Sequence, residues 1–152
     1  MTRAHRIFTV ALCILIGLTL SLMLTLSLMP PSINAGNIEA AGDLVGSVVG
    51  EGSAIGGFIL QNISSLAHLF EYFVLGVEIG LLFVFALGVR GYSPIMPVVA
   101  LGVPFLDETL QIFSGRHASV ADMWVDVCGI TVGYFSVRII GCVIKRYKIG
   151  KM

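Results

Sequence analysis

The chain has 152 residues, of which 57% are hydrophobic and 12% charged, and its nine basic residues balance its nine acidic residues. Soluble domains carry about 25% charged residues. The composition therefore excludes a soluble globular monomer, a disordered chain, a nucleic-acid-binding arm and a coiled coil. With a mean hydropathy of +0.97, the chain is expected to be an integral membrane protein whose partner is the lipid bilayer and not nucleic acid.

Four apolar segments are long enough to cross a bilayer, and they cover residues 7–29, 67–87, 92–113 and 123–144. A helix of about 20 residues spans the hydrocarbon core, which is roughly 30 Å thick. The first segment is longer than the apolar part of a signal peptide, so we expect an uncleaved anchor. The sequence predicts an all-α, multi-pass membrane protein built as a four-helix bundle.

The basic residues predict the orientation of these spans. Eight of the nine fall on one side of the membrane in this arrangement: Arg3, Arg6, Arg90, Arg138, Lys145, Arg146, Lys148 and Lys151. Only Arg116 falls on the other side. Because loops rich in Lys and Arg stay in the cytoplasm, we expect both termini to be cytoplasmic.

The chain divides into four parts. Residues 1–29 form the cytoplasmic flank and first anchor, 30–63 an external Gly-rich segment, 64–146 a three-helix region that carries the polar motifs, and 147–152 a basic cytoplasmic tail. In the external segment Gly42, Gly46 and Gly50 recur every four residues, a spacing that lets helices approach closely in lipid. The segment is expected to be either a short interfacial or re-entrant helix or a flexible loop. The three cysteines lie within spans, where we expect helix contacts and no disulfide framework.

Ionisable and polar residues gather where three spans meet the outer side. His68 and Glu71 begin the second span, Asp107, Glu108 and Gln111 end the third, and Arg116 lies in the following loop. The fourth span begins with Asp122 and Asp126. Ionisable groups inside a membrane are costly and mark candidate functional sites.

Helical spacing predicts that this cluster lies between helices. Asp122, Asp126, Gly129 and Gly133 share one face of the fourth span, so the acids lie on the face that packs closely. Arg116 could neutralise Glu108 or Asp122 in a network that joins the helix ends, or the cluster could be a binding or reactive site. One arginine cannot neutralise five carboxylates, so the surplus charge requires protons, a metal or a cationic ligand. The deeper Glu78 is expected to be buried and hydrogen-bonded to the fourth span.

Three chemistries fit these residues. A divalent metal could be held by His68, Glu71 and neighbouring carboxylates, with Mg²⁺, Ca²⁺ or Mn²⁺ favoured by oxygen ligands. Asp107 and Glu108 could act in general acid–base catalysis together with His68, or Arg116, Gln111 and His68 could recognise a polar head group. The sequence contains no phosphate-binding P-loop, no Gly-x-Ser-x-Gly elbow and no His-Glu-x-x-His motif.

Three motifs together resemble the VanZ-like family of small bacterial membrane proteins. They are His-x-x-Glu-Tyr at residues 68–72, Asp-Glu-x-x-Gln-x-Phe-x-x-Gly-Arg at 107–116, and Asp-x-x-x-Asp-x-x-Gly-x-x-x-Gly at 122–133. Ser65 stands where the family usually has a basic residue, three positions before the histidine. The resemblance covers roughly half of the chain.

The resemblance implies a multi-pass protein of the bacterial plasma membrane, in a family whose founding members lower susceptibility to the lipoglycopeptide teicoplanin. It implies one site, whose members are His68, Glu71, Tyr72, Asp107, Glu108, Gln111, Arg116, Asp122 and Asp126. The leading expectation is an envelope protein that handles or masks a lipid-linked molecule or the lipoglycopeptide itself. The alternatives are a membrane enzyme acting on a lipid-linked wall precursor, with or without a divalent metal, and a structural or partner-binding bundle.

Overall fold

The computed structural model describes residues 2–50, 53–88, 93–116 and 118–149, and within them all regular structure is helical. The helices are α1 (Arg3–Ser27), α2 (Pro31–Val49), α3 (Ala54–Gln61), α4 (Ile63–Leu81), the short π-helical turn η1 (Leu82–Ala86), α5 (Ile95–Phe113) and α6 (Val120–Ile149).

Four helices are long and apolar enough to cross a membrane, and they correspond to the four predicted spans. They cover Arg3–Ser27, Ile63–Ala86, Ile95–Phe113 and Val120–Tyr147. Their outer surface is apolar, with exposed side chains such as Phe113 and Val98, whereas Glu78, Asp107 and Asp126 are buried inside. This distribution fits a bundle surrounded by hydrocarbon, because only internal polar groups can find partners there. For the described residues, an all-helical architecture with four candidate membrane-spanning helices is confirmed.

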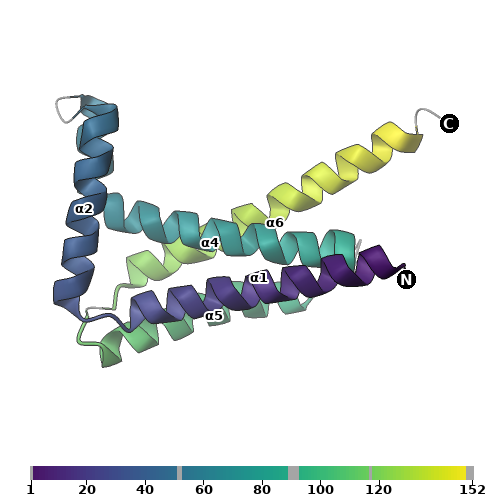
Figure 1. Cartoon of the computed structure of the whole chain (residues 1–152), viewed down its shortest axis with the longest axis horizontal. Coiled ribbons are helices and arrows are strands. Elements are labelled where there is room, and N and C mark those ends of the chain that lie inside the picture. The colour runs from purple at the N-terminus through teal and green to yellow at the C-terminus, as the bar shows by residue number, and fades with distance from the viewer. Residues whose placement is uncertain (1, 51–52, 89–92, 117, 150–152) are drawn as a thin grey trace.

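The helices α1, α4 and α5 run side by side, while α6 crosses α4 and its C-terminal half diverges from the others (Figure 1). The described ends of α1 and α6 that lie nearest the two termini point to the same end of the bundle. The turn between α5 and α6 lies at the opposite end, together with the lower part of α2. Three connections thus return the chain to the side on which it began, as four spans require.

Glycines allow α4 and α6 to pack with their backbones almost in contact. A Cβ added to Gly129 would lie 2.7 Å from the Leu69 carbonyl oxygen, and one added to Gly133 or Gly76 would collide with backbone of the facing helix. This confirms the prediction that Gly129 and Gly133 mediate close packing on the face that carries Asp126. The fully buried side chains of Tyr72, Leu75 and Ile130 complete this interface.

The segment that is expected to be external is helical over Pro31–Val49 and Ala54–Gln61. Helix α2 stands across the end of the bundle, transverse to α1 and α4 (Figure 1), so residues 31–49 form a helix and the loop alternative is wrong for them. Gly42 lies in ordinary contact with Leu60 of α3. Helix α2 thus lies over the end of the bundle where the polar residues gather.

One expectation about the cysteines is wrong. Cys13, Cys128 and Cys142 are free thiols, as predicted, but all three are exposed on the outer surface of the bundle. The cysteines do not mediate the closest helix contacts, which are made by glycines such as Gly129 and Gly133 because glycines permit closer approach.

Candidate functional site

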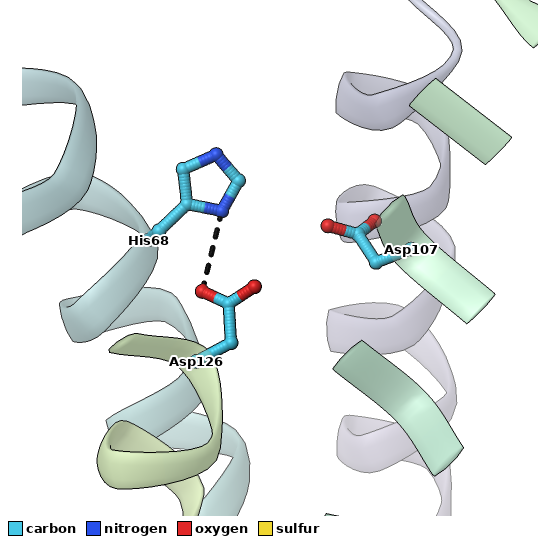
Figure 2. Close-up of side chains that lie close together, drawn as sticks. All are labelled: His68, Asp107 and Asp126. Atoms are coloured by element: carbon cyan, nitrogen blue, oxygen red, sulfur yellow. Dashed lines mark ion pairs between the residues drawn. The ribbon is translucent and has the colours of Figure 1, made fainter. Parts of the chain in front are cut away.

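The centre of the polar cluster is formed by three residues from three helices. His68 on α4, Asp107 on α5 and Asp126 on α6 face one another across the bundle (Figure 2), and each offers an atom that lies within 4.8 Å of the other two. The Nδ1 atom of His68 lies 3.4 Å from Oδ1 of Asp126. The sequence therefore correctly grouped these three positions, although they are up to 58 residues apart.

Asp107 is held in place by hydrogen bonds from two helices. The Ser27 hydroxyl at the end of α1 donates to Oδ1, and the Gln111 amide donates to Oδ2 at 3.2 Å. The Ser114 hydroxyl, just beyond the end of α5, donates to the Ser27 carbonyl at 3.0 Å. These bonds fix the end of the first span against α5 and orient the Asp107 carboxylate.

Asp126 differs from Asp107 because no hydrogen bond reaches its carboxylate, whose one close polar neighbour among the described residues is the imidazole of His68. The residue is fully buried, and neither carboxylate oxygen has a hydrogen-bond partner. The hydroxyl of Tyr72, also fully buried, has none either. A buried ionised group normally requires a donor or a counter-ion, so the centre of the cluster has capacity for a further partner.

Glu108 and Asp122 make hydrogen bonds that stabilise the start of α6. The Ser119 backbone N–H donates to Oε2 of Glu108 at 2.7 Å, and the Ser119 hydroxyl accepts from the Asp122 backbone N–H at 3.3 Å. The Ser65 hydroxyl donates to Asp122 at 3.1 Å. This is an N-terminal cap, reinforced by an acid in the first turn of the helix. The other oxygen of Glu108 is buried without a partner.

Arg116 does not join the helix ends by ion pairs, so that alternative is wrong. Its guanidinium donates one long hydrogen bond, 3.5 Å, to the Leu26 carbonyl at the end of α1. Among the described residues it lies within ion-pair distance of neither Glu108 nor Asp122. Gly115, directly before Arg116, turns the chain with a positive φ of 77°, and the Arg116 guanidinium reaches the end of α1.

A cavity of about 160 Å³ opens beside the cluster, between the end of α1, α2 and the start of α4. Its polar lining comes from Arg116, His68, Glu71 and Asn37, and the Arg116 charge acts on Glu71. Its apolar lining includes Ile38 of α2. The cavity thus combines both signs of charge with hydrocarbon surface, and His68 belongs to both the cavity and the buried centre.

A larger cavity of about 420 Å³ lies between α5 and α6, away from the cluster. It is lined mostly by apolar residues, and Arg138 lies at its polar end in contact with Tyr134. Glu78 belongs to neither cavity, and its predicted bond to the fourth span is wrong. The Thr19 hydroxyl of α1 donates to it at 2.9 Å, because Glu78 faces the first span.

Sequence reasoning missed three contributors to the site: Ser27, Asn37 and Ser119. Ser119 could have been found, since Ser-x-x-Asp before an apolar run is a helix-start signal. Ser27 stands in an apolar segment with several other hydroxyl residues, and nothing in the sequence distinguishes it. Asn37 lies in α2, whose position over the bundle end carries no sequence signal.

Comparison of the chain with models of protein families, with curated proteins and with solved structures finds no match.

Proposed function

We propose that this chain is a VanZ-like protein of the bacterial plasma membrane that binds the polar head of a lipid-linked envelope molecule, and so lowers susceptibility to lipoglycopeptides of the teicoplanin type. The observation that carries the proposal is the cavity beside the cluster, where Arg116, His68 and Glu71 meet apolar surface from α1 and α2. In this proposal that end of the bundle faces the outside, as the distribution of basic residues predicts.

The lining of the cavity fits an amphiphilic ligand. An arginine binds phosphate or carboxylate through paired hydrogen bonds, and Arg116 has donors to spare because the structure gives it one side-chain hydrogen bond. The neighbouring acid Glu71 accepts hydrogen bonds from sugar or amide groups. A hydrocarbon chain would leave the cavity along the apolar side chains of α1 and α2.

The size of the cavity limits what enters it. Sites for drug-sized molecules measure about 300–1,000 Å³, whereas this cavity holds about 160 Å³. It therefore accommodates a head-group fragment, such as one phosphate or one sugar ring, with the rest of the molecule outside. A whole lipoglycopeptide would have to bind on the surface around it.

The second candidate is a membrane enzyme that acts on a lipid-linked wall precursor. Glu108 retains a buried oxygen without a partner, and Asp107 and His68 lie in the adjacent cluster, so groups for acid–base catalysis are present beside the cavity. The third candidate is a structural or partner-binding bundle. The hydrogen bond from the Ser119 backbone N–H to Glu108 favours a structural role for Glu108.

The test is teicoplanin and vancomycin susceptibility in a sensitive Gram-positive host, with each protein at matched membrane level. We expect the wild type to protect against teicoplanin, Arg116→Gln to lose protection, and Arg146→Gln to keep it. Arg146 is a suitable control because it is an exposed arginine near the other end of α6. Absence of protection by the wild type, or full protection by Arg116→Gln, would overturn the proposal.

A variant of the buried centre separates binding from catalysis. Asp107→Asn keeps the shape of the side chain but removes its charge. An enzyme would lose protection in this variant at every expression level, whereas a protein that masks its ligand would keep protection that rises with expression. Membrane abundance is measured in parallel, so that a folding defect is recognised.

A further inference from the structure

The buried centre of the cluster has the composition of a metal site. His68, Asp107 and Asp126 supply one imidazole nitrogen and two carboxylates, all within 4.8 Å of one another. They come from three different helices and point into a common space (Figure 2). Zn²⁺ and Mn²⁺ accept this mixture of ligands, since imidazole favours Zn²⁺ and carboxylate oxygen favours Mn²⁺.

A second observation points to a ligand at this place. Asp126 is fully buried, and both of its oxygens lack a hydrogen-bond donor. The Nδ1 atom of His68 is also without a hydrogen bond, although it lies 3.4 Å from Oδ1 of Asp126. A bound cation would satisfy both oxygens of Asp126 together with an unprotonated Nδ1 of His68.

The charges agree with a divalent ion. Neutral His68 with two ionised aspartates carries a charge of −2, and Arg116, the cation in the neighbouring turn, bonds to the Leu26 carbonyl instead of to these acids. If His68 is protonated instead, it pairs with Asp126, but one imidazolium cannot balance two ionised carboxylates, which are costly inside a bundle surrounded by lipid. One divalent ion neutralises the pair.

The surroundings of Asp107 and Asp126 suit ligation. Metal ligands are usually oriented by outer hydrogen bonds, and Ser27 and Gln111 do this for Asp107. Ligand atoms around Zn²⁺ lie about 3–3.5 Å apart, so the pair of His68 and Asp126 already has a suitable spacing, and Asp107 offers an oxygen within 4.8 Å of both. The buried hydroxyl of Tyr72, within electrostatic reach of both aspartates, could donate to a water bound on the ion.

We propose that His68, Asp107 and Asp126 form a binding site for one divalent transition-metal ion, either Zn²⁺ or Mn²⁺. Three protein ligands would leave a coordination position open, and His68 also lines the 160 Å³ cavity, so the metal site would adjoin that cavity. The site does not depend on the function proposed above. It is tested by metal content, which does not require any activity.

The experiment measures metal bound to the purified full-length chain in detergent, after removal of any affinity tag. The protein is incubated with Zn²⁺ or with Mn²⁺, desalted and analysed by mass spectrometry of the metal. We expect about one ion per chain for the wild type with at least one of the two metals. Asp126→Asn and His68→Gln should lose at least nine-tenths of it.

Glu78→Gln is the matched control. It also removes a buried carboxylate from the bundle, but Glu78 lies outside the cluster and bonds to Thr19, so its metal content should equal that of the wild type. Zn²⁺ bound by the exposed cysteines would persist in Asp126→Asn. Metal content that is unchanged in both Asp126→Asn and His68→Gln, or a wild type that retains neither metal, would overturn the proposal.

Thermal unfolding of the wild type provides a second measurement in case the variants do not fold. A metal that binds only the folded state raises the unfolding temperature in a concentration-dependent way. We expect this rise with the metal that is retained, and its reversal by a chelator. No rise would contradict the site. A metal-bound protein that gives no protection against teicoplanin would overturn only the function proposed above.

Discussion

The contact between α4 and α6 can be tested by adding a single methyl group at Gly129. The new Cβ would lie 2.7 Å from the Leu69 carbonyl oxygen, 3.0 Å from Cβ of Tyr72 and 3.1 Å from the Phe73 nitrogen. Ordinary contact begins at 3.4 Å, so the helices must separate by about 0.7 Å (3.4 minus 2.7) to admit the methyl group. Because two of the three atoms belong to backbone, a side-chain rotation cannot relieve the crowding.

The expected loss of stability follows from comparison with a glycine in open space. An added Cβ at Gly102 on α5 would meet no atom within 4 Å, so Gly102→Ala gains only helix propensity, about 1 kcal/mol. Gly129→Ala gains the same propensity but adds overpacking, which costs about 1–3 kcal/mol. The difference between the two variants should therefore be about 1–3 kcal/mol in the free energy of unfolding.

Unfolding of the purified protein in mixed micelles, titrated with dodecyl sulfate and followed by circular dichroism, measures this difference. Leu69 and Tyr72 flank the cluster, so Gly129→Ala should also move His68 away from Asp126 and reduce metal content. If Gly129→Ala is as stable as Gly102→Ala, α4 and α6 do not approach as closely as described.

The remaining tests concern the loop cation, a hydrogen bond between the first two spans, and topology. Arg116→Ala should change the free energy of unfolding by no more than about 0.5 kcal/mol, since a half-buried side chain with one long hydrogen bond contributes little; a loss of about 3 kcal/mol or more would indicate a buried ion pair. Thr19→Val should cost about 1–3 kcal/mol in the same titration, because it leaves buried Glu78 without its donor; an unchanged midpoint would mean that the bond does not form. In a background without native cysteines, Ser53→Cys should react with an impermeant maleimide on intact cells and Lys145→Cys only after lysis, and the reverse pattern would refute cytoplasmic termini.

The spans could be predicted from the sequence because their physics is local. Hydrocarbon thickness fixes the length of an apolar helix, and the described helices agree with the predicted segments within a few residues at most ends. The shared face of Asp126, Gly129 and Gly133 was predictable for the same reason, since helical periodicity alone determines it. The proximity of His68, Asp107 and Asp126 could be predicted because each lies near the end of a span on the same side of the membrane in the predicted arrangement.

The pairing of side chains could not be predicted, because it depends on contacts between distant segments. Ser27 and Asp107 are 80 residues apart, and their bond requires that α1 lie against α5. Thr19 and Glu78 pair for a similar reason. Charge alone predicted that Arg116 would pair with Glu108 or Asp122, which are close to it in sequence. In the structure the chain turns at Gly115, and Arg116 bonds to the end of α1 instead.

The polar cluster therefore contains two kinds of acid, and they should not be interpreted alike. Glu108 and Asp122 accept hydrogen bonds that organise the start of α6 and its contact with Ser65, so loss of function in their variants would not distinguish a folding defect from a defect in the site. Asp126 accepts none and has only the His68 imidazole close by, and burial of a carboxylate with so few partners is a cost that helix packing alone does not require. Asp126 lies on the tightly packed face of α6 near Gly129, where a bound ligand could offset this cost. Substitution of Asp126 is therefore the most informative about function.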